Sequence, residues 1–200
     1  MKKLIAFLLF MTISLLVACS DSKTTEAPVD GKTVEEQTTP EESVQTETTI
    51  EVNTEATSSA SSNEDLKEAF ANYIDQISQL AEEEERILGL YSGVTGVNYQ
   101  DDEILYYTLL DEVIPGYNLF IGDLEAIMPK HPEIIALHEK YIEAANIQLG
   151  AFTLMISALE EQNFDTVTEA NAALDESRTL LREWIYEVDA LSAETGVSLN

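Results

Sequence analysis

The sequence has little that could support cross-links, sulfur-based metal binding or recognition of anions. Its 200 residues include one cysteine, so it can form neither an intramolecular disulfide nor a paired-cysteine metal site. Only 10 residues are lysine or arginine, against 38 aspartate or glutamate, which gives a formal net charge of −28. Because phosphate recognition needs a basic surface, this balance argues against a nucleic-acid partner. Hydrophobic residues nevertheless make up 44% of the chain, enough for a packed core.

The N-terminus has the layout of a secretory signal. Lys2-Lys3 precedes an apolar run, Leu4–Leu16, which is too short and wrongly flanked for a membrane-spanning helix. The run ends in Leu16-Val17-Ala18-Cys19, which resembles the lipobox of bacterial lipoproteins. The resemblance implies that residues 1–18 are a signal peptide, cleaved between Ala18 and Cys19, and that Cys19 is diacylated. Two acyl chains anchor a protein stably, so we expect it at the extracytoplasmic face of the cell membrane. The alternatives are a plain signal peptide and an N-terminal anchor.

The next segment is polar and acidic. Residues 20–63 contain ten threonines, seven serines, ten acidic residues, two lysines and no aromatic residue. Such a segment buries too little apolar surface to offset the entropy lost on ordering. We therefore predict that 19–63 is a lipidated cysteine followed by a disordered, self-repelling tether. Residues 64–200 contain every aromatic residue that follows the signal, so we place the folded domain there.

Four segments of the folded domain have apolar residues at alternating spacings of three and four, which predicts amphipathic helices. They cover about 64–92, 100–128, 132–161 and 165–193. The connections between them are short, and no segment alternates as a strand does. We predict an all-α fold, an antiparallel up-down-up-down four-helix bundle preceded by the disordered linker. The heptad spacing also permits a helix-exchanged dimer in place of a monomer.

The stripes of the second and third helices follow from the same spacing. Pro115 interrupts the second helix, yet the stripe keeps its phase from Val113 to Tyr117, so we predict one kinked helix rather than two. The predicted second stripe is Tyr106, Leu110, Val113, Tyr117, Phe120, Leu124 and Ile127. The predicted third stripe is Ile135, His138, Ile142, Ala145, Leu149, Phe152, Ile156 and Leu159.

Three positions on the predicted stripes are polar, namely Glu84, His138 and Ser177. At 1.5 Å per residue, the predicted topology places His138 about 16–21 Å along the bundle axis from the other two. A catalytic triad needs direct hydrogen bonds, so this arrangement excludes serine hydrolysis. There is also no glycine-rich phosphate loop, nucleophile elbow or zincin motif, and we expect no enzymatic activity.

The weak candidates for a ligand site are His138, Glu84 and Arg178. Glu84 lies near the level of Ser177, and we expect it either to reach solvent or to pair with Arg178. His138 is either a satisfied core histidine or a ligand contact, with room opposite it at Gly122. No spacing typical of a zinc, di-iron or covalent haem site is present, so we expect no metal and no cofactor.

The segment Ile135-Ala-Leu-His138-Glu-Lys-Tyr141-Ile-Glu-Ala-Ala and the alanine-rich last helix resemble uncharacterised lipoproteins of Gram-positive bacteria. Those proteins combine a lipobox, a Thr/Glu-rich tether and a helical domain of unknown function. The sequence thus indicates a lipid-anchored, acidic, non-enzymatic surface module that binds a protein or cell-wall partner. The alternative is an extracytoplasmic binding protein that holds a small ligand or metal near His138 or Glu84.

Overall fold

The computed structural model describes residues 55–199, and side chains from residue 63 onward. The predicted signal peptide 1–18, the lipobox with Cys19, and the predicted tether as far as residue 54 lie outside the described residues. The first helix begins at Glu55, earlier than the start near residue 64 that the composition predicts.

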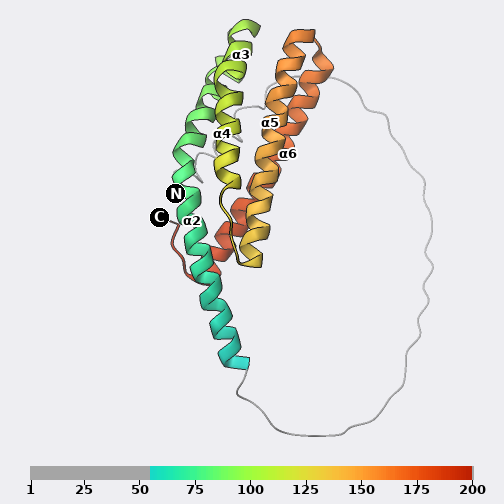
Figure 1. Ribbon diagram of the computed structural model, residues 1–200. Coiled ribbons are helices and arrows are strands. Elements are labelled where there is room, and N and C mark those ends of the chain that lie inside the picture. The colour runs from blue at the N-terminus through green and yellow to red at the C-terminus, as the bar shows by residue number, and fades with distance from the viewer. Residues whose placement is uncertain (1–54, 200) are drawn as a thin grey trace, which may run out of the picture.

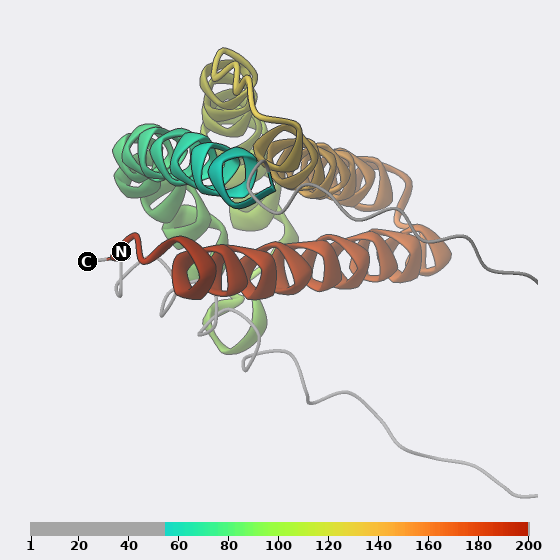
Figure 2. The ribbon, with the colours of Figure 1, turned by 90° about the horizontal axis from the view of Figure 1, so that it is seen from below.

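The described part of the chain is all-helical, and four helical segments pack around one core (Figure 1). They are α2 (Glu55–Gly93), the run of α3 (Asp102–Thr108), η2 (Leu109–Val113) and α4 (Ile114–Glu125), then α5 (Pro132–Glu161) and α6 (Phe164–Thr195). A short 3₁₀ turn, η1 (Gly96–Asn98), lies between α2 and α3. Helix α2 packs against α4 and α6, and α5 packs against the same two helices. In Figure 2, seen from below, α6 runs across the view beside α2 and α5.

Residues with clear local preferences determine where the helices begin and end. The Asp101 side chain accepts a hydrogen bond from the Ile104 N–H at 2.8 Å, which caps the start of α3. Pro132 occupies the first position of α5, where its missing N–H costs nothing. Helix α6 ends at Gly196, whose φ of 71° is the left-handed conformation that glycine adopts readily. The predicted ends of the last two helices are therefore confirmed to within about two residues.

The second helical segment is continuous through Pro115, which confirms the prediction of one helix rather than two, while the predicted kink at the proline stays a prediction. Proline has no N–H to donate to the carbonyl of Asp111, and its ring crowds that carbonyl. The run adapts with the π-helical turn η2, in which the Ile114 N–H donates to the Leu109 carbonyl, five residues back. The wider turn shifts the phase of the residues before it. Leu105 and Leu109 are therefore buried in place of the predicted Tyr106 and Leu110, and Leu110 is exposed.

The predicted stripe of α5 is centred one position too late. Ile134, Leu137 and Tyr141 are buried, whereas the predicted Ile135 is exposed and Ile142 is only half-buried. This helix is apolar on most of its circumference, so periodicity alone does not fix its register. Among the described helices, α5 is also the one that is long and apolar enough to cross a membrane. Buried core helices of soluble proteins often meet the same criterion, so this is weak evidence for a membrane span.

Gly116 lets α4 approach α2 closely. A Cβ atom at this buried position would lie 3.1 Å from Ile87 Cγ1, closer than van der Waals contact. Gly150, in the middle of α5, is exposed, and a Cβ atom there would have no neighbour within 4 Å.

We therefore expect the same substitution to have opposite effects at the two glycines. Gly116→Leu overpacks the contact with Ile87 and should lower the free energy of unfolding by about 1–3 kcal/mol. Gly150→Leu gains helix propensity and should raise it by about 0.5–1 kcal/mol. Urea unfolding followed by circular dichroism measures both, and equal shifts for the two variants would contradict the close approach of α4 to α2.

Candidate functional site

The centre of the core contains a buried carboxyl group. Glu84 of α2 is 2% exposed, and it is the only buried carboxylate among the described side chains. The Tyr141 hydroxyl, on α5, donates a hydrogen bond to Glu84 Oε2 at 2.6 Å. Neither Glu84 Oε1 nor the buried Tyr117 hydroxyl of α4 has a hydrogen-bond partner. The expectation that Glu84 reaches solvent or pairs with Arg178 is therefore wrong.

Burial changes the acid–base properties of these three side chains. Desolvation disfavours the carboxylate and raises the pKa of Glu84 from 4.5 to about 7, although the Tyr141 hydrogen bond acts in the opposite direction. Desolvation, together with the nearby Glu84 charge, also raises the pKa of Tyr117 and of Tyr141 well above 10. Glu84 is thus a carboxyl group that changes charge near neutral pH while both tyrosines stay neutral.

Aromatic contacts connect this carboxyl group to His138. The ring centroids of Tyr141 and Trp184 lie 4.7 Å apart, and the Trp184 indole N–H donates to the Tyr73 hydroxyl at 3.2 Å. Tyr73 in turn meets the His138 ring edge-to-face at 5.6 Å. The two candidate residues are therefore joined through three aromatic side chains and make no hydrogen bond to each other.

His138 is buried, as expected for a core histidine, but its ring nitrogens lack the hydrogen-bond partners that a satisfied core histidine would have. Neither imidazole nitrogen makes a hydrogen bond of ordinary geometry. Burial lowers the pKa of His138, while the nearby carbonyls of Ile127 and Leu124 at the end of α4 act in the opposite direction. Gly122, expected to leave room opposite this ring, is exposed.

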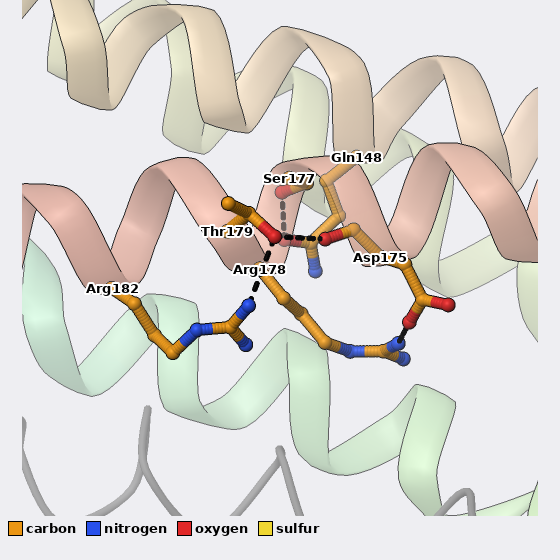
Figure 3. Close-up of polar contacts among 6 residues, drawn as sticks. All are labelled: Gln148, Asp175, Ser177, Arg178, Thr179 and Arg182. Atoms are coloured by element: carbon orange, nitrogen blue, oxygen red, sulfur yellow. Dashed lines mark hydrogen bonds and ion pairs between the residues drawn. The ribbon is translucent and has the colours of Figure 1, made fainter. Parts of the chain in front are cut away.

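Neither Ser177 nor Arg178 is bonded to Glu84, and both have other partners (Figure 3). The buried Ser177 hydroxyl donates to the Ala144 carbonyl at 2.8 Å and lies 3.3 Å from Gln148 Oε1. The Arg178 guanidinium pairs with Asp175 on the same helix at 2.5 Å. Glu84, His138 and Ser177 therefore have separate surroundings, and the described residues bring no catalytic triad together.

The described residues do not assemble a metal site either, since no group of three or more His, Cys, Asp or Glu side chains lies close enough to hold an ion. A surface groove of about 510 Å³ lies where α2 meets the loop before α5. Its lining mixes acidic side chains such as Asp65 and Glu68 with Lys130 and Tyr73.

Sequence reasoning missed three side chains of the polar core, namely Tyr117 as a partnerless hydroxyl, Tyr141 as the partner of Glu84, and Gln148 as the neighbour of Ser177. Neither Tyr141 nor Gln148 belongs to the predicted core stripe of α5, whose register lies one position later. Their spacing of seven residues, with Ile134 seven residues earlier, is the signal that fits the observed register.

The buried carboxyl makes stability depend on pH in a defined direction. The folded pKa of Glu84, about 7, lies above the unfolded value of 4.5, so folding takes up a proton between these values. This contribution is fully present below about pH 4.5 and is lost as the pH rises through 7. We expect wild type to lose about 3 kcal/mol relative to Glu84→Gln between pH 4.5 and 7.5. Urea unfolding at several pH values measures the difference.

The matched control is Glu85→Gln, which removes an exposed carboxylate next to Glu84. It should keep the wild-type dependence on pH, because Glu84 is retained. A Glu84→Gln variant whose stability followed the wild-type pH profile would show that Glu84 is not buried in the folded chain.

Comparison with models of protein families, with curated proteins and with solved structures finds no match for this chain. A function can therefore be inferred only from the chain's own residues and contacts.

Proposed function

We propose that this protein is a lipid-anchored, extracytoplasmic, non-enzymatic module that binds a protein or cell-wall partner at the cell surface. Its anchor is the diacylated Cys19 at the end of the lipobox-like segment Leu16-Val17-Ala18-Cys19. The observation that carries the proposal is the distribution of charge. Residues 64–200 have 28 acidic against 6 basic residues, and every described carboxylate except Glu84 is intermediate or exposed in the folded chain. The acidic segment between Cys19 and the start of α2 at Glu55 would be the tether that separates this surface from the membrane.

The proposed architecture is an antiparallel up-down-up-down four-helix bundle on that tether. Short connections support it, because residues 126–131 and 162–163 are the whole of the last two links between helices. The packing supports it as well, since each helical segment contacts the next one in sequence and α6 contacts α2.

Three of the candidate side chains are engaged within the fold itself, which suits a binding module. Among the described residues, the Ser177 hydroxyl is bonded to a backbone carbonyl, and the buried Glu84 accepts a hydrogen bond from Tyr141. Arg178, the candidate cation, is paired with Asp175.

The anchor is tested by Cys19→Ser in the producing bacterium. We expect this variant to lose the mass of the acyl chains and to leave the membrane fraction, because serine cannot take the thioether-linked lipid. Mass spectrometry of the mature chain and membrane fractionation measure the two effects. Ser20→Ala, which leaves the lipobox cysteine in place, is the matched control and should stay acylated. An acylated, membrane-bound Cys19→Ser chain would refute the proposal.

A second candidate function is the binding of a small ligand or a metal ion within the core. It is favoured by the buried polar atoms without partners, namely Glu84 Oε1, the Tyr117 hydroxyl and both nitrogens of His138. Native mass spectrometry and elemental analysis of the purified chain test it. A stoichiometric ligand or metal that His138→Ala or Glu84→Gln removes would support this candidate, and a mass equal to that of the acylated polypeptide with nothing else bound would exclude it.

A further inference from the structure

The outer face of the second helical segment exposes apolar side chains. Ile104, Tyr107 and Leu110 follow one another at spacings of three residues and are 37%, 53% and 41% exposed. Residues three apart are neighbours on a helix surface, so the three side chains form one row, here called the α3 outer stripe. The buried residues of the same run, Leu105 and Leu109, face the core. The shift of phase at η2 is what leaves Leu110 outside.

Along the sequence, the charged residues around the α3 outer stripe are all acidic. In space, Arg86 of α2 lies near Glu112, but it already pairs with Glu83. No lysine or arginine occurs between Arg86 and Lys130, an interval that includes the whole of α3, η2 and α4. Glu103 and Asp111, next to the stripe in sequence, are both exposed, as are Asp102 and Glu112. The apolar row is thus flanked by carboxylates along its length.

The position of the stripe suits contact with a partner on the side of the domain away from the membrane. Figure 1 shows α3 at the opposite end of the molecule from the first turn of α2. Since the proposed tether precedes the start of α2, α3 would lie at the end of the domain farther from that attachment point.

We propose that the α3 outer stripe is a docking surface for a cationic amphipathic segment of a partner polypeptide. This inference rests on the proposed function and specifies the class of its partner. Apolar residues of the partner would cover Tyr107 and its two neighbours, and its lysine or arginine side chains would lie against Glu103 and Asp111.

Charge complementarity selects this occupant over two others. A second copy of the chain would bring a like-charged surface against the stripe, and three of the domain's six basic residues, Arg86, Lys140 and Arg178, already pair with acidic side chains of the same chain. An anionic lipid surface would be repelled for the same reason.

The test uses the full-length chain in detergent and a synthetic helical peptide of leucine and lysine, about 18 residues long, with leucine on one face. A peptide of the same composition in scrambled order is the control for charge alone. We expect the amphipathic peptide to bind at least about tenfold more tightly than the scrambled one. Isothermal titration calorimetry at low and physiological salt measures both affinities.

Matched variants locate the binding surface. We expect Tyr107→Ser to weaken binding of the amphipathic peptide about tenfold, because an aromatic side chain at the centre of an interface contributes most of its affinity. Leu119→Ser removes another exposed apolar residue from the same helical run, away from the stripe, and should leave the affinity unchanged. The double variant Glu103→Gln, Asp111→Asn should reduce the salt dependence of the peptide affinity more than the control double variant Asp123→Asn, Glu125→Gln.

Three results would overturn the inference. They are equal affinity for the two peptides, equal losses for Tyr107→Ser and Leu119→Ser, and a dimer of the chain that Tyr107→Ser abolishes. The first two leave the proposed function intact if cross-linking on intact cells still attaches a partner through another surface. A wild-type chain that is not found in the membrane fraction would instead refute the proposed function, whatever the peptide affinities are.

Discussion

Repulsion among carboxylates is the main constraint on how the domain can fold. With 28 acidic and 6 basic residues in 64–200, charge opposes a compact state unless the carboxylates stay in water. Amphipathic helices meet this requirement, because each buries one apolar face and leaves its charges outside. Lys140 of α5 also offsets some repulsion by pairing with both Glu183 and Glu187 of α6. Glu84 is the exception, and its burial is tolerated because the group can take up a proton near neutral pH.

Pro115 has an effect that reaches beyond its own turn. The π-helical turn that accommodates it lets Leu105, Leu109 and Val113, each four residues from the next, all face the core. A regular α-helix would rotate such a series steadily away from the core. The same adjustment places Leu110 on the outside, so a backbone requirement of one proline contributes to the exposed apolar surface of α3.

The sequence predicts the four helical segments well because their ends have distinct chemical signals. Pro132 and Gly196 are examples. The surroundings of Glu84 were not predicted, because it is buried where solvent or Arg178 was expected. The sequence does not predict the register of α5, since Ile134 and Ile135, or Tyr141 and Ile142, are adjacent and equally apolar. Choosing between them requires the packing of the other helices. The Glu84–Tyr141 hydrogen bond depends on that choice, so the partner of Glu84 could not be identified from spacing alone. The lipobox cysteine lies outside the described residues and stays a prediction.

The aromatic contacts around Glu84 have a practical consequence. Trp184 is the only tryptophan in the chain, and it lies against Tyr141, whose hydroxyl binds the buried carboxyl group. Its indole N–H is also bonded to Tyr73, which contacts His138. Indole fluorescence responds to nearby charge and to the polarity of its surroundings. The protein therefore contains an intrinsic optical reporter of its own core, placed between Glu84 and His138 and requiring no added label.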